Sequence, residues 1–144
     1  MIMVLLVLLE VAYAGWQYKY NHYFTPGFHS EANFELQQGF SIGVSPLEQG
    51  PLLSTSYTYL GRMEFGVGLE QVIADRFSIR AQVIRGESGT GGKGELFVHF
   101  TPFNESNNAI QRKVHHGLVF SGSKVGDDWF VGAGYHFGFG NLNL

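Results

Sequence analysis

Cysteine is absent from this chain of 144 residues, and charged residues are scarce. The lack of cysteine excludes disulfides and thiolate metal sites. Lys and Arg together number only nine and are scattered, so no basic stripe is present that would neutralise a phosphate backbone. Helical spacing of apolar residues is also hard to find after Gly15. Nucleic-acid binding and a helical fold are therefore not expected.

Glycine and aromatic residues are abundant instead. The chain has 20 Gly, 13 Phe, 7 Tyr and 2 Trp, while Asp, Glu, Lys and Arg make up only 15% of it. This combination is unusual for a soluble enzyme. It is typical of a membrane β-barrel, in which aromatic side chains face lipid and small residues fit the interior. The length suits one domain.

The N-terminal segment resembles an export signal. Residues 1–9 are almost wholly apolar, and Ala12-Tyr13-Ala14 places small residues at the two positions that a signal peptidase reads. We therefore expect a signal peptide over residues 1–14 and a β-barrel domain over residues 15–144. No Lys or Arg precedes the apolar run and Glu10 lies near its end, so a buried N-terminal strand or helix is the alternative. The run is shorter than the roughly 20 apolar residues of a transmembrane helix.

Alternation of apolar and polar residues recurs along the rest of the chain. In the first such segment, Tyr18 and Tyr20 share one face while Gln17 and Lys19 share the other. A period of two predicts β-strands. Eight segments show it: Trp16 to Phe24, Asn33 to Val44, Leu52 to Leu60, Met63 to Glu70, Arg76 to Arg85, Glu95 to Thr101, Val114 to Ser121 and Trp129 to Phe139.

Turn-forming residues separate these segments. They occur at Thr25-Pro26-Gly27, Ser45-Pro46, Gly86 to Gly92, Asn104 to Asn108 and Gly122 to Asp128. Each connection is short enough for a hairpin, so the sequence predicts an all-β fold, an eight-stranded antiparallel up-and-down barrel. Its first and last strands would pair. One rim is expected to carry Thr25 to Glu31, Gly61, Gly86 to Gly92 and Gly122 to Asp127.

The polar face of the segments decides between a membrane barrel and a soluble one. A soluble barrel usually covers its outside with Lys, Glu, Asp and Arg, whereas this face is made of Gly, Ser, Thr, Gln and a few ionisable residues. Such residues suit the narrow interior of an eight-stranded barrel. The sequence therefore predicts a transmembrane barrel with its bulky side chains outward. A soluble, lipocalin-like ligand-binding barrel is an alternative.

The segment from Lys124 to Phe137 resembles the closing strand of small outer-membrane β-barrels of the OmpX, Ail and OmpA transmembrane-domain type. It alternates apolar residues with Gly and ends in Tyr135-His136-Phe137. The resemblance implies a porin-like barrel, a monomer located in the bacterial outer membrane in contact with its lipid and lipopolysaccharide. Because the connecting loops are short, large adhesive loops are not expected, and a structural role in envelope integrity or a small interaction at the cell surface is favoured.

Ionisable residues on the polar face predict a network of ion pairs inside the lumen. The residues assigned to it are Lys19, Glu35, Glu64, Glu70 and Arg80. We expect Lys19 to pair with Glu35, and Arg80 with Glu64 or Glu70. The pairs would fill the lumen and block water flow, with structural packing as their main role.

Six histidines raise the question of a metal site. His115 and His116 are adjacent and so point to opposite faces of a strand. His99, His115 and His136 share the lumen face on consecutive strands and are able to converge. Neither a metal nor a cofactor site is assigned, because a histidine in such a barrel is more often an ordinary polar aromatic residue.

A catalytic site is not expected either. Outer-membrane lipid A 3-O-deacylases carry a His-x-Ser-Asn motif, and the nearest fragment here, His99-Phe100-Thr101, is followed by Pro102 where Asn would be required. His29-Ser30-Glu31 fits a turn. A non-enzymatic barrel is therefore the main expectation, and a lipid-modifying hydrolase is the alternative.

Overall fold

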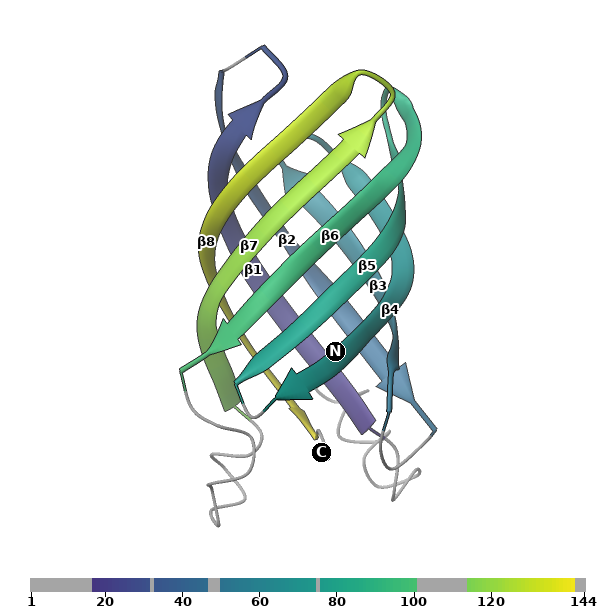
Figure 1. Cartoon of the computed structure of the whole chain (residues 1–144), viewed down its shortest axis with the longest axis vertical. Helices are drawn as coiled ribbons and strands as arrows, with labels where there is room; N and C mark the ends of the chain where they lie inside the picture. The colour runs from purple at the N-terminus through teal and green to yellow at the C-terminus, as the bar shows by residue number, and fades with distance from the viewer. Residues whose placement is uncertain (1–16, 32, 47–49, 75, 101–113, 142–144) are drawn as a thin grey trace.

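The chain folds into a closed antiparallel β-barrel. The computed structural model describes residues 17–31, 33–46, 50–74, 76–100 and 114–141. Within them lie eight strands: β1 (Gln17–His29), β2 (Phe34–Ser45), β3 (Leu52–Leu60), β4 (Glu64–Ala74), β5 (Phe77–Gly86), β6 (Gly89–His99), β7 (Val114–Val125) and β8 (Asp128–Asn141). Each strand pairs with the next, and β1 pairs with β8 to close the sheet (Figure 1). The eight-stranded up-and-down topology predicted from the sequence is confirmed.

The described residues include no helix with the length and apolar character needed to cross a bilayer.

The two rims of the barrel differ. The β1–β2, β3–β4, β5–β6 and β7–β8 hairpins turn at one rim, and β1 begins and β8 ends at the other (Figure 1). The β5–β6 turn consists of Glu87 and Ser88, and the β7–β8 turn of Gly126 and Asp127. Gly126 has φ +60° and Gly61, in the β3–β4 turn, has φ +83°. Glycine adopts this left-handed region without steric cost, which lets the chain reverse tightly.

Several strands extend beyond their expected ends. β6 begins at Gly89 rather than Glu95, so most of the loop expected over Gly86 to Gly92 is strand. Gly91 and Gly92 lie opposite Val125 and Lys124 of β7, which likewise runs past its expected end. These glycines have weak strand preference on their own, but pairing with a strand on each side holds them extended.

The turn expected at Thr25-Pro26-Gly27 is wrong. These residues lie within β1, and all three are opposite residues of β2. The ladder with β8 skips Thr25 and Pro26 and resumes at Gly27. Proline has no amide hydrogen to donate, so an interruption on one side of the strand is what it requires.

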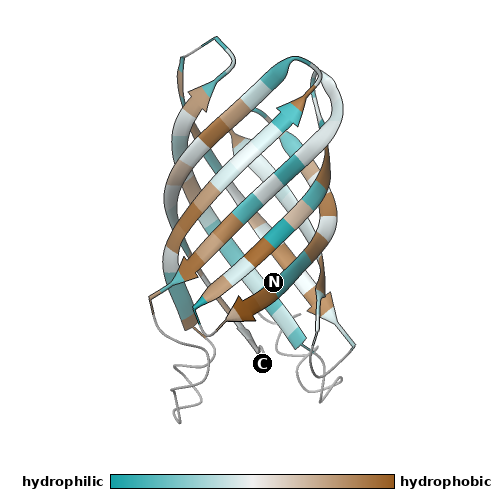
Figure 2. Ribbon diagram, in the orientation of Figure 1, coloured by the Kyte–Doolittle hydropathy of each residue, from teal (hydrophilic) through white to brown (hydrophobic). Residues whose placement is uncertain are grey.

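Hydrophobic and hydrophilic residues alternate along much of the strands, as the bands in Figure 2 show, and their exposure separates an outer face from an inner one. Bulky apolar residues such as Phe65, Ile79 and Tyr135 are more than 40% exposed on the outer face. The inner face is mainly polar and buried. Phe97, which interrupts the polar face of its segment in the sequence, lies inside with Tyr23 and Val119 in a fully buried cluster. The outward placement of the bulky side chains is thus confirmed for most of them; Tyr18, also expected on the outer face, is only 8% exposed.

Aromatic pairs line the seam where β1 meets β8. Tyr20 is opposite Phe139 and His22 is opposite Phe137. Their ring centroids are 5.2 Å and 5.3 Å apart, and both pairs are stacked. Cross-strand aromatic contacts of this kind stabilise strand pairing on the outer face.

Some sequence-based expectations fall outside the described residues. They include the signal peptide predicted over residues 1–14 and the turn predicted over Asn104 to Asn108. They also include Trp16, the first residue of the first predicted strand.

Candidate functional site: the barrel interior

Besides three histidines, six ionisable side chains of the described residues are buried inside the barrel, three from Lys or Arg and three from Glu. None of them is more than 6% exposed. They are Lys19, Arg80, Lys93, Glu64, Glu70 and Glu95. Buried charges are tolerated when they are paired, and equal numbers of the two signs allow the interior to be neutral overall.

Glu95 is the acceptor for two of the basic residues. Arg80 on β5 lies opposite Glu95 on β6 and forms an ion pair with it through Nη2. Lys93 Nζ lies 3.7 Å from Glu95 Oε1. The guanidinium carbon of Arg80 is 4.9 Å from the ring centroid of Phe97, and Lys93 Nζ is 5.3 Å from that of Tyr23. Each cation therefore has an aromatic ring near it in addition to the Glu95 carboxylate, and the ring stabilises its positive charge by a cation–π interaction.

A second group of polar side chains crosses the interior. Lys19 Nζ on β1 forms an ion pair with Glu70 Oε1 on β4, two strands that are not neighbours in the sheet. Ser78 Oγ on β5 donates to the same carboxylate oxygen at 3.0 Å. The Lys19 ammonium also lies 4.4 Å from the ring centroid of Phe97. Phe97 thus contacts cations of both groups and joins them into one packed interior.

The five residues assigned to a lumen network all lie on the inner face, but their pairings differ from those expected. Lys19 is opposite Gly43 whereas Glu35 is opposite Gly27, so the two charges lie at different ends of the β1–β2 ladder. Lys19 pairs with Glu70 instead.

Arg80 lies between Glu70 of β4 and Glu95 of β6, which are opposite it in the two adjoining ladders, and its salt bridge is with Glu95. It pairs with neither Glu64 nor Glu70 among the salt bridges of the described residues. Glu64 accepts a hydrogen bond from Gln37 Nε2 at 3.3 Å.

Arg62, in the β3–β4 turn, forms salt bridges with residues of two other hairpins at the rim where the hairpins turn. Its Nε lies 3.4 Å from Glu35 Oε2, and its backbone N–H donates to Glu35 Oε1 at 3.0 Å. Its Nη1 lies 3.1 Å from Asp128 Oδ2, while Ser30 Oγ donates to Asp128 Oδ1 at 2.8 Å. The mouth of the barrel is therefore bridged from the β3–β4 turn to both β2 and β8.

The sequence analysis did not assign Glu95 to the network, although Glu95 lies in a predicted strand, and it placed Arg62, Lys93 and Asp128 in no strand. Lys93 follows Gly91-Gly92, which favours a loop. Arg62 lies in a turn and Asp128 at the very start of β8, and strand alternation does not show which way such residues face. The signal available for Lys93 was its spacing of two from Glu95, which places both side chains on one face of a strand.

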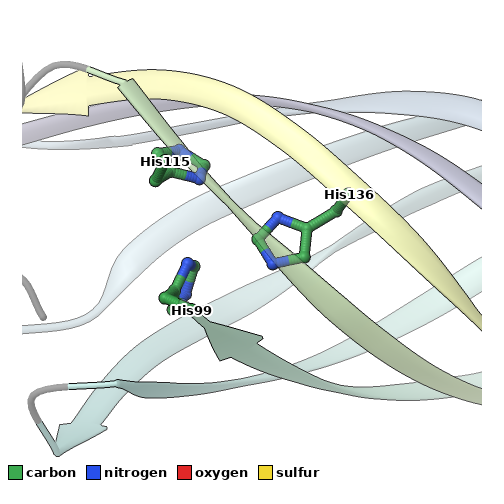
Figure 3. Close-up of side chains that lie close together, drawn as sticks. All are labelled: His99, His115 and His136. Atoms are coloured by element: carbon green, nitrogen blue, oxygen red, sulfur yellow. The ribbon is translucent and has the colours of Figure 1, made fainter. Parts of the chain in front are cut away.

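Three histidines meet inside the barrel toward the rim at which the chain ends. His99 on β6 and His136 on β8 both lie opposite Gly117 of β7, and His115 precedes Gly117 by two positions on the same face. Their side chains are buried, at 1%, 0% and 4% exposed respectively. Figure 3 shows the three rings turned toward one another from the three strands. The sequence indicated that these residues share a face, and the register brings them into contact.

Gly117 makes this arrangement possible. A Cβ atom built on Gly117 would overlap the carbonyl oxygen of Val98 on the neighbouring strand. The rings of His99 and His136, which lie opposite Gly117 on its two sides, have their centroids 4.9 Å apart.

A hydrolytic triad is not found among the described residues. Ser78 Oγ lies 3.3 Å from His99 Nε2, but its hydrogen is donated to Glu70. A serine nucleophile instead donates to the histidine, and the acid lies on the far side of the imidazole. In the other candidate fragment, His29-Ser30-Glu31, the serine hydroxyl donates to Asp128.

Comparisons with known proteins support the fold alone. No protein-family model matches the chain, and no curated protein matches it in sequence. Among solved structures, one described as "De novo design of transmembrane beta-barrels" is similar with a TM-score of 0.51 and 12% identity, over 83% of this chain and 94% of the other. The solution NMR structure of the de novo designed TMB2.3 is similar with a TM-score of 0.50 and 15% identity, over 84% and 94%. The chain is therefore a small eight-stranded barrel that resembles transmembrane barrels.

Proposed function

We propose that this protein is a small, monomeric outer-membrane β-barrel of bacteria whose filled lumen serves a structural role in the envelope or an interaction at its surface. It contacts membrane lipid and lipopolysaccharide through its outer face and conducts no ions. The observation that carries the proposal is the inversion of side chains, with apolar residues outside and ion pairs inside.

The outer face supports a lipid environment. Val83, Leu53 and Val131 are 63%, 53% and 59% exposed, on three strands spread around the barrel. Water disfavours such a surface, since a soluble monomer rarely exposes contiguous apolar patches larger than a few hundred Å². A bilayer favours it, because every strand is paired on both edges and leaves no open sheet edge in lipid.

The interior supports a barrel that does not conduct. Tyr23 on β1 hydrogen-bonds through its hydroxyl with Thr58 Oγ1 on β3 at 2.9 Å, and its ring packs against Phe97 and Val119. These side chains are fully buried or nearly so. Packing of this kind across the lumen supports a barrel that does not conduct, because the interior of an eight-stranded barrel is just wide enough for side chains to fill.

Two measurements test this proposal. We expect the native protein to stay with the membrane fraction after washes with salt and carbonate, to be released by detergent, and to migrate faster on an unheated SDS gel than after boiling. Release without detergent, and solubility of residues 15–144 in buffer alone, would instead favour the soluble ligand-binding barrel.

Conductance tests the filled lumen separately. The folded protein in a planar lipid bilayer should give no discrete channel openings under conditions in which a larger porin gives them. Regular single-channel currents would contradict the structural role and indicate a pore.

A further inference from the structure

The centres of the three buried histidine rings are spaced as the ligands of one metal ion would be. The ring centroids of His99, His115 and His136 are 4.9, 5.3 and 5.7 Å apart. In a tetrahedral zinc site with Zn–N bonds of about 2.0 Å, imidazole centres lie about 5 Å apart. The backbone therefore already holds the rings at the required separation.

The ring nitrogens need only a small adjustment. One ligand atom from each histidine can be chosen so that all three lie within 4.8 Å of one another. Tetrahedral coordination brings these atoms to about 3.4 Å. Because the centroid spacing is already close to that of a zinc site, rotations of the rings about their side-chain torsions are the adjustment that we expect on metal binding.

Neighbouring side chains orient two of the rings. His136 Nδ1 lies 2.9 Å from Oδ1 of the Asn21 side-chain amide, and this contact orients the ring. Ser78 gives its hydrogen to Glu70, so it accepts from His99 Nε2, and the lone pair of that ring is on Nδ1. Polar partners that fix the tautomer of a histidine ligand are a usual feature of metal sites.

The third ring is polar and buried, and no neighbouring side chain satisfies it. The His115 side chain is only 4% exposed, and no side chain of the described residues hydrogen-bonds to its Nδ1 or Nε2. An imidazole in such a place loses its hydrogen bonds to water and gains none from the side chains around it. A metal ion bound to one of these nitrogens would offset part of that cost.

We propose that His99, His115 and His136 form a binding site for a divalent transition-metal ion of the zinc type. Three imidazoles are the donor set preferred by Zn²⁺, Co²⁺, Ni²⁺ and Cu²⁺ and disfavoured by Mg²⁺ and Ca²⁺, which take oxygen ligands. The three histidines supply three ligands, and a water molecule or an anion takes the fourth position. This site is additional to the structural role proposed above and does not depend on it.

Zn²⁺ and Co²⁺ are the probes for testing the site. The full chain is folded in detergent, stripped with a chelator and titrated with each ion, both after folding and with the ion present during folding. We expect one equivalent of Zn²⁺ to bind per chain, and Co²⁺ to give the intense visible absorption of a tetrahedral complex. Mg²⁺ should not compete. Absence of saturable binding under both regimes would overturn the proposal.

Single substitutions locate the bound ion. His99→Gln, His115→Gln and His136→Gln should each weaken Zn²⁺ binding by at least about tenfold, which is the low end of what loss even of a supporting partner causes. His116→Ala is the matched control, because His116 adjoins His115 in sequence and lies on the outer face beside Tyr135. Equal loss in the control, or undiminished binding in all three variants, would contradict the assignment.

A second readout does not rely on folding of the variants. In the wild-type protein with ¹⁵N-labelled histidine, Zn²⁺ should shift the imidazole signals of three of the six histidines. The shifted signals should be those of His99, His115 and His136. Shifts confined to other histidines, or no shift at all, would overturn the proposal.

Discussion

Lys19 and Glu70 form an ion pair across the barrel interior from strands that are not neighbours in the sheet. Both side chains are almost completely buried. Each therefore depends on the other for its charge to be tolerated there, and the pair connects the wall that contains β1 with the wall that contains β4.

Removal of one partner of this pair should destabilise the barrel strongly. Glu70→Gln leaves the Lys19 ammonium without its carboxylate, and loss of one member of a buried pair typically costs about 3–5 kcal/mol. The measurement is the midpoint of urea unfolding in lipid vesicles, followed by the heat-dependent gel shift. The double variant Lys19→Met with Glu70→Leu should recover most of the lost stability, and a single variant as stable as the wild type would contradict the pairing.

The rim salt bridges should matter much less than the interior ones. The Arg62 side chain is 32% exposed and its partner Asp128 is 41% exposed. Pairs in contact with water contribute about 0–1 kcal/mol, so Arg62→Ala should lower the unfolding free energy by no more than about 1 kcal/mol. The same urea titration measures it. A loss as large as that of Glu70→Gln would show that the rim cluster holds the hairpins together.

Gly117 should not tolerate a side chain. The Cβ of Gly117→Ala would overlap the carbonyl oxygen of Val98, so the β6–β7 ladder or the histidine cluster would have to shift. We expect a clear loss in the yield of the folded, fast-migrating form. Gly94→Ala is the control, because nothing lies within 4 Å of a Cβ built there. Equal yields from the two variants would argue against close packing at Gly117.

The aromatic pairs at the β1–β8 seam should contribute coupling energy. In a double-mutant cycle of Tyr20→Ala and Phe139→Ala we expect a coupling of about 0.5–1.5 kcal/mol, the range for stacked rings. Val83→Ala combined with Phe139→Ala should show none, since Val83 lies on β5 and has no contact with the seam. A coupling near zero for the first pair would mean that backbone pairing alone closes the barrel.

Strand alternation was sufficient to predict the fold. The third segment, Leu52 to Leu60, was placed with its observed limits, and the inner positions Lys19, Arg80 and His136 were assigned to the correct face. Alternation succeeds here because side chains of a strand point to the two faces in turn and the two environments, lipid and lumen, select opposite residue types.

Strand alternation could not predict which charged side chains form ion pairs inside the lumen. Which charges meet depends on the stagger between strands, and one residue of stagger changes every partner. Lys19 meets Glu70 because of a register accumulated over β2 and β3, and no local pattern encodes it. The ends of strands were also misjudged where Gly89 to Gly94 and Pro26 occur, because pairing with neighbours outweighs the local preference of glycine and proline.

The pairing of β1 with β8 sets the order in which the barrel can assemble. The four hairpins that turn at one rim join strands that are adjacent in sequence, so they can form quickly. The β1–β8 ladder instead pairs residues from the two ends of the barrel sequence, such as Tyr18 with Asn141. Bringing such distant segments together carries the largest loop-closure entropy, so this ladder should form last. Until then the two outermost strands keep unpaired amide groups that are costly in hydrocarbon. The slow step of membrane insertion is therefore expected at this seam, and a covalent staple between β1 and β8 should accelerate it.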